Sequence, residues 1–109
     1  MTNYILNAAV VTNYGIFRYT EISLQEAQDL LSMGDYVCAI GHDSTAKLFS
    51  QITKHEVEPN RIQVKMNKGD NAIVFWASRR LPEGYVVETV EELQQIGFTF
   101  GYLEMLKNL

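Results

Sequence analysis

The sequence YVCAIGHDST, residues 36–45, decides how this chain folds. Residues 36–40 are short, apolar and β-branched enough to form a buried strand. Asp43 or Ser44 can cap a following helix by accepting a backbone N–H, and Gly41 allows a tight bend before it. The helical spacing of the side chains that follow predicts a helix to about Lys54; they are Thr45, Leu48, Phe49 and Ile52. Residues 41–45 are therefore predicted to form a strand-to-helix turn.

This turn is a candidate phosphate site. The start of a helix offers unpaired backbone N–H groups and the positive end of the helix dipole, which together favour a bound anion. Ser44 and Thr45 lie in the first helical turn and are candidate ligand contacts. His42 projects at the turn, where an imidazole can donate a proton near neutral pH. The alternative is that His42 lies in a loop without any chemical role.

Composition limits the function classes. A chain of 109 residues with 47% apolar and 20% charged residues is one ordinary globular domain spanning residues 1–109. Its single cysteine, Cys38, excludes a disulfide framework, and no metal-ligand motif is present, so we expect no metal or other cofactor. No segment has the length and apolarity of a membrane span, which predicts a cytoplasmic protein with no membrane partner.

The charge balance argues against binding of long nucleic acids. The chain has 13 acidic and nine basic residues, which gives a formal net charge of −4. A protein that grips a nucleic-acid backbone needs a broad basic surface. A small phosphate ligand, bound by two or three local arginines, remains compatible with this charge.

Alternating and apolar runs predict the rest of an α/β domain. Capping boxes at Ser23 and Thr89 predict two further helices, which Gly34 and Gly97 end. We expect additional strands over residues 4–11, 16–22, 61–66, 71–78 and 98–105, with 16–22 at a sheet edge. The prediction is a single mixed β-sheet of about five to six strands with three short helices.

Three arginines form a second candidate site. Residues 61–66 and 71–78 are expected to pair as an antiparallel hairpin through a 67–70 loop, which would put Arg61 near Arg79 and Arg80. The planar guanidinium binds phosphate with two parallel hydrogen bonds. Glu83 can pair with one arginine, orient it, or act on a hydroxyl. Alternatively, all of these are solvated loop charges that contribute little.

Asn7 is the polar member of the apolar run 4–11. A buried asparagine must find hydrogen-bond partners, so it is either structural or faces a ligand. The sequence leaves both interpretations open.

The ordered set of motifs resembles the viral anti-CRISPR ring nucleases. The resemblance rests on the Gly-His-Asp-Ser-Thr turn at 41–45, on Asn60-Arg61, and on the Arg-Leu-Pro-Glu-Gly run at 80–84. It covers nearly the whole chain, because the order and spacing of all segments agree. Members of this family occur in archaeal viruses and bacterial mobile elements, and the Thr-Asn-Tyr-Gly turn at 12–15 is similar to the bacterial branch.

The resemblance implies an activity and roles for residues. Family members are homodimers that cleave cyclic tetra-adenylate, a second messenger of type III CRISPR defence, without a metal. By this resemblance His42 is the general acid, Arg61 and Arg80 contact phosphate, Glu83 supports the active site, and Asn7 lines the ligand cavity. Where the archaeal viral pattern has a serine, three positions after this asparagine, the chain has Val10, so contacts from that serine are not expected.

Two other function classes stay open at the level of sequence. A module that binds a cyclic nucleotide without cutting it would need the arginines but not His42. An interaction protein would need neither, and would expose an apolar patch instead.

Overall fold

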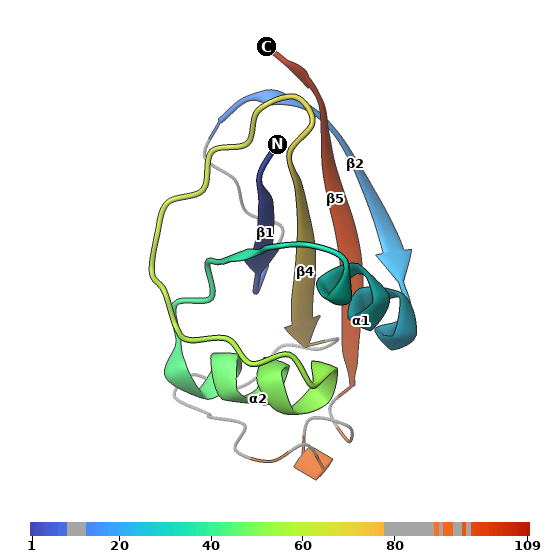
Figure 1. Cartoon of the computed structure of the whole chain (residues 1–109), viewed down its shortest axis with the longest axis vertical. Helices are drawn as coiled ribbons and strands as arrows, with labels where there is room; N and C mark the ends of the chain where they lie inside the picture. The colour runs from blue at the N-terminus through green and yellow to red at the C-terminus, as the bar shows by residue number, and fades with distance from the viewer. Residues whose placement is uncertain (9–12, 78–88, 90, 93–94, 96) are drawn as a thin grey trace.

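A five-stranded mixed sheet with the strand order β2-β5-β4-β1-β3 forms the centre of the fold (Figure 1). The computed structural model describes residues 1–8, 13–77, 89, 91–92, 95 and 97–109. The strands are β1 (Asn3–Leu6), β2 (Gly15–Ile22), β3 (Val37–Cys38), β4 (Asn71–Ala77) and β5 (Phe98–Asn108), and the helices are α1 (Leu24–Ser32) and α2 (Asp43–Thr53). The predicted α/β class and the mixed sheet are confirmed.

Strand β1 lies in the middle of the parallel part of the sheet. It pairs in parallel with β3 on one side and with β4 on the other. Strand β5 pairs antiparallel with β4 and with β2, which forms the opposite edge, as predicted for residues 16–22. Because β1, β3 and β4 run in the same direction, their carboxyl ends lie at one end of the sheet.

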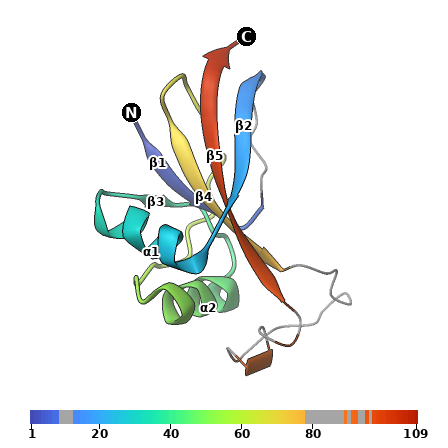
Figure 2. The ribbon, with the colours of Figure 1, turned by 90° about the vertical axis from the view of Figure 1, so that its right-hand side faces the viewer.

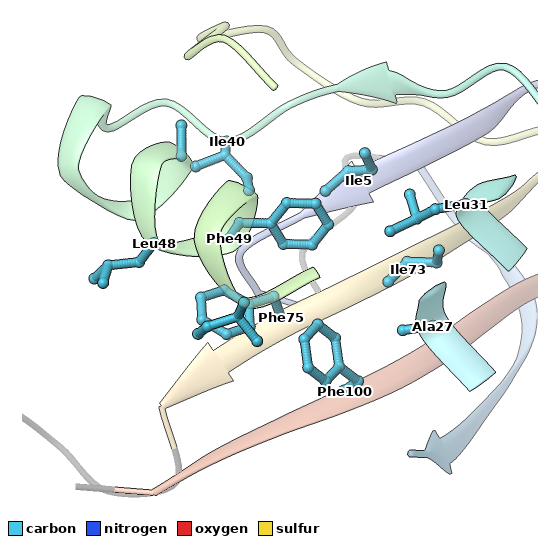
Figure 3. Close-up of a cluster of buried hydrophobic side chains, with 11 residues drawn as sticks. Ile5, Ala27, Leu31, Ile40, Leu48, Phe49, Ile73, Phe75 and Phe100 are labelled. Atoms are coloured by element: carbon cyan, nitrogen blue, oxygen red, sulfur yellow. The ribbon is translucent and has the colours of Figure 1, made fainter. Parts of the chain in front are cut away.

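Both helices cover the same face of the sheet (Figure 2). Phe49 of α2 is fully buried and lies among Ile5, Phe75 and Phe100 of the sheet (Figure 3). Its ring centroid is 5.8 Å from that of Phe75 and 6.3 Å from that of Phe100, and both pairs meet edge to face. This is a favoured geometry for aromatic rings, so Phe49 joins α2 to β4 and β5.

The opposite face has a second core that no described helix covers. The buried sheet residues there are Leu6, Ala72, Val74, Leu103 and Met105. Val64 and Met66, from the segment before β4, pack on them and are also buried. Alternation along each strand sends successive side chains to opposite faces, which explains why neighbours such as Ile73 and Val74 belong to different cores.

The predicted hairpin of residues 61–66 with 71–78 is wrong. Residues 61–66 form no strand, because both edges of β4 are already occupied by β1 and β5. Instead, the Asn13 amide donates to the Met66 carbonyl at 2.6 Å and accepts from the Met66 N–H at 3.0 Å. The apolar alternation does reflect burial, since Val64 and Met66 are buried, but the two side chains pack on one face of the sheet and the segment does not join it.

Two predicted strands also differ from the structure. The strand expected over 4–11 ends at Leu6, and a bend at Asn7 and Ala8 follows it. The strand expected over 36–40 is reduced to β3, which lies at a sheet edge with Val37 40% exposed, so it is not a buried strand. An edge strand keeps one side without strand partners, and short edge strands are common for that reason.

The capping box predicted at Ser23 is confirmed. The Ser23 hydroxyl accepts from the Glu26 N–H at 3.1 Å, and the Glu26 carboxylate accepts from the Ser23 N–H at 3.0 Å. The Thr89 hydroxyl accepts from the Glu92 N–H at 3.1 Å, although most of the helix predicted there lies outside the described residues.

In the part of the chain that the structure describes, no helix is long and apolar enough to cross a membrane.

Replacing Phe49 with alanine should strongly destabilise the protein. Truncating a fully buried aromatic side chain leaves a cavity and removes its ring contacts, which typically costs about 3–5 kcal/mol. Urea denaturation followed by circular dichroism measures the change. Gln51→Ala, at an exposed position of the same helix, is the matched control and should change the free energy of unfolding by less than about 0.5 kcal/mol. Equal stability of the two variants would contradict the described core.

Candidate functional site

The turn after β3 places His42 at the start of α2. His42 is the N-cap residue, with extended backbone angles, and its side chain makes no capping hydrogen bond. The helix therefore begins at Asp43, and the prediction that Asp43 or Ser44 is the cap is wrong by one or two residues. The His42 side chain is exposed, while its carbonyl accepts the first helical bond, from the Ala46 N–H at 3.0 Å. An imidazole that does not cap its own helix is available to a ligand.

Arg61 lies against the glycine that precedes this histidine. A Cβ atom built on Gly41 would be 3.4 Å from Arg61 Nε and 3.5 Å from Arg61 Cβ. Gly41 does not have a positive φ, so its glycine is not required for the tight bend that we expected. The distances to Arg61 are ordinary van der Waals distances, so the Arg61 stem lies beside Gly41 without requiring a glycine there. The structure thus brings Arg61 to the turn that contains His42, by a different route from the predicted hairpin.

The carboxyl ends of the parallel strands lead to the same region. Asn7 directly follows β1 and is half-buried. The chain after β3 also stays beside β1, because the Ala39 N–H donates a hydrogen bond to the Ile5 carbonyl at 2.8 Å. β4 ends at Ala77 at this end of the sheet. In open α/β sheets, ligands bind outside the carboxyl ends of the strands.

The structure describes only some of the remaining candidate residues. Thr45 is half-buried in the first turn of α2, and Ser44 lies beside it in the helix. Arg79, Arg80 and Glu83 lie outside the described residues. The expected proximity of Arg61 to Arg80 depended on the hairpin, and that basis for it is lost.

Charges around the start of α2 are partly paired. The Lys47 ammonium is 3.1 Å from the Asp43 carboxylate, one helical turn away, and both side chains are well exposed. Such an exposed pair contributes only a few tenths of a kcal/mol. A ligand phosphate could therefore compete for Lys47 at little cost.

A surface hollow of about 540 Å³ lies beside the turn, between α2 and the residues that follow it. Lys47 and Lys54 line it together with Asp43, Glu56 and Glu58, whereas His42 and Arg61 do not. Three carboxylates against two ammonium groups make this hollow a poor seat for a polyanion. The candidate site is therefore the exposed surface at His42 and Arg61.

No group of three or more His, Cys, Asp and Glu side chains that could hold a metal ion occurs among the described residues. His55, the second histidine, lies after the end of α2 and is half-buried.

Comparison with known proteins shows to which family the chain belongs. The profile of the STIV B116-like family matches residues 3–100. The chain belongs to this family. It is 36% identical over 107 residues to protein 26 of Sulfolobus islandicus filamentous virus, covering 94% of this chain and 91% of that protein. It is 33% identical over 103 residues to YddF of Bacillus subtilis, covering 93% and 94%.

The B116-like fold is also found in a solved structure. B116 of Sulfolobus turreted icosahedral virus matches with a TM-score of 0.75 at 26% sequence identity, over 95% of this chain and 99% of B116. Relatives in archaeal viruses and in a bacterium agree with the distribution that the resemblance implied. These matches show a family with viral and bacterial members, and they do not assign an activity.

One neighbour of the site was missed by sequence reasoning. Asn60 belongs to the quoted motif, yet no role was predicted for its side chain, which donates to the Cys38 carbonyl at 2.8 Å. The only available signal was its place directly before Arg61, because contacts between residues 38 and 60 leave no local pattern.

Cys38 should react slowly with thiol reagents at mild pH. Burial raises the pKa of its thiol, and a backbone hydrogen bond at Ile40 only partly opposes this effect. Since the thiolate is the reactive form, the rate of alkylation by iodoacetamide should continue to rise above the usual thiol pKa of about 8.5. Mass spectrometry of this single cysteine across a pH series measures the rate. Urea-unfolded protein is the control, and an identical pH midpoint in both states would contradict the prediction.

Proposed function

We propose that this protein is a metal-independent ring nuclease that cleaves cyclic tetra-adenylate to linear di-adenylates and so counters type III CRISPR signalling. The observation that supports it is the exposed His42 at the start of α2, directly after the glycine against which Arg61 packs. This arrangement puts a proton donor, a guanidinium and a helix N-terminus together. Those are the groups that a phosphodiester cleavage needs.

RNA supplies its own nucleophile for this reaction. The ribose 2′-oxygen attacks the adjacent phosphorus and loses its proton to solvent, while the bond from phosphorus to the 5′-oxygen breaks. His42 donates a proton to the departing 5′-oxygen, which leaves as a hydroxyl. The product is a di-adenylate that ends in a 2′,3′-cyclic phosphate.

The other groups bind the ring and stabilise charge. Arg61 and Arg80 neutralise the negative charge that grows on the phosphate oxygens, and Glu83 supports Arg80. The remaining ligand contacts come from Asn7, Ser44, Thr45 and Arg79. These groups align the 2′-oxygen with the 5′-oxygen, which is the entropic part of the catalysis.

The active form is a homodimer. A four-nucleotide ring on the two-fold axis of a dimer meets two copies of His42, one at each of two opposite phosphates. This symmetry explains why two cuts give two identical di-adenylates. The ligand is small and carries few charges, which is compatible with a chain of net charge −4.

Removing the general acid should slow cleavage and spare binding. His42→Ala should lose about 10²–10⁴-fold in single-turnover rate on cyclic tetra-adenylate, with little change in affinity, because the proton is transferred only in the transition state. Arg80→Ala should weaken both, since a phosphate contact exists before and during the reaction. His55→Ala, the matched histidine outside the site, should resemble the wild type. Rates come from rapid-quench assays and affinities from titration calorimetry.

A modified substrate separates the acid from the phosphate contacts. Sulfur in place of the scissile 5′-oxygen leaves as a thiolate that needs no proton, so it should largely rescue His42→Ala and not Arg80→Ala. Normal cleavage of the ordinary ring by His42→Ala would overturn the acid assignment. A lasting wild-type complex without products would indicate a binding module, and no binding at all would indicate an interaction protein.

Cleavage should persist in excess EDTA. Attack by the 2′-oxygen needs alignment, charge neutralisation and an acid, and in this proposal side chains provide all three. The rate with EDTA should equal the rate with added Mg²⁺. Activity that EDTA abolishes and Mg²⁺ restores would exclude the proposed mechanism.

A further inference from the structure

Asn60 extends the outer edge of the β3 segment. Its backbone N–H donates to the Ile40 carbonyl at 2.7 Å, and its side-chain amide donates to the Cys38 carbonyl at 2.8 Å. Carbonyls two residues apart along an extended chain point to the same side. The N–H of Ala39, between them, donates in the opposite direction to Ile5 of β1. One asparagine therefore satisfies two successive outward carbonyls at this edge.

These two hydrogen bonds fix the backbone position from which the Arg61 side chain extends. Arg61 is the next residue, and its Cβ, Cγ and Nε all lie 3.4–3.6 Å from the position that a Cβ on Gly41 would take. Within the described residues, no carboxylate forms an ion pair with Arg61. Among the described residues, the contacts that place this exposed side chain are therefore the backbone at Asn60 and Gly41.

The other end of the same segment has its own anchor. Asn13 binds both the N–H and the carbonyl of Met66, whose side chain is fully buried in the second core. Val64 is also buried there. Loss of the Asn60 amide therefore loosens only the end of the segment that contains Arg61. Since Asn60 is exposed, its substitution leaves both cores intact.

We propose that Asn60 is a positioning residue that acts through Arg61, pre-organising its guanidinium beside His42 for a ligand phosphate. The inference rests on the proposed function, because it assumes that Arg61 contacts the phosphate of cyclic tetra-adenylate. A long side chain that is already oriented loses less conformational entropy when it binds. Asn60 thereby contributes to affinity without touching the ligand.

The test is a double-mutant cycle with Asn60→Leu, which keeps a similar size and removes the N–H donors without adding a charge. Alone, it should weaken binding of cyclic tetra-adenylate about three- to tenfold, the range expected for one hydrogen bond. In an Arg61→Ala background it should cause no further loss. Asn13→Ala is the matched control, because it detaches the opposite end of the segment: it should lower the melting temperature and leave affinity unchanged.

The free protein gives a second readout. Relaxation of the Arg61 Nε–H group by NMR should show larger-amplitude motion in Asn60→Leu than in the wild type and in Asn13→Ala. Wild-type affinity and unchanged Arg61 motion in Asn60→Leu would overturn the positioning role, as would an equal loss in the Arg61→Ala background. Failure of the wild type itself to bind the ring would instead refute the proposed function, and this inference with it.

Discussion

The parallel pairing of β1 with both β3 and β4 is the constraint on which the rest of the structure depends. Parallel neighbours cannot be joined by tight turns, so the chain must cross between them, and α1 and α2 occupy those crossings. Both helices then bury their apolar stripes on one face, around Phe49. The same pairing directs Asn7 and the His42 turn to one end of the sheet, where α/β proteins bind ligands.

The segment between α2 and β4 cannot pair with β4, because β1 and β5 occupy both edges of that strand. It contributes instead to the second core and to the candidate site. It crosses the face that lacks a described helix, where Val64 and Met66 complete the second core. On the way it passes the outer edge of β3, where Asn60 binds two carbonyls and Arg61 packs on Gly41. One stretch of chain thus contributes both to stability and to the candidate site, with a separate anchor for each role.

Local charge at the site differs from the charge of the whole chain. The protein is acidic, yet His42, Arg61 and the N-terminus of α2 form a small region suited to an anion. Next to it, the Asp43–Lys47 pair and the mixed charges of the adjacent hollow prevent this region from becoming a broad basic surface. Such an arrangement favours a compact phosphate ligand over an extended nucleic acid.

The sequence alone determined the features that depend on neighbours a few residues apart. The capping box at Ser23, the apolar stripe of α2 and the strand-to-helix turn at His42 all follow from short-range spacing. Only the tertiary structure decided which strands pair, because hydrogen bonds between strands depend on competition among distant segments. As a result, β4 pairs with β1 and β5, and residues 61–66 are excluded from the sheet. Arg61 instead lies beside Gly41, twenty positions earlier in the chain.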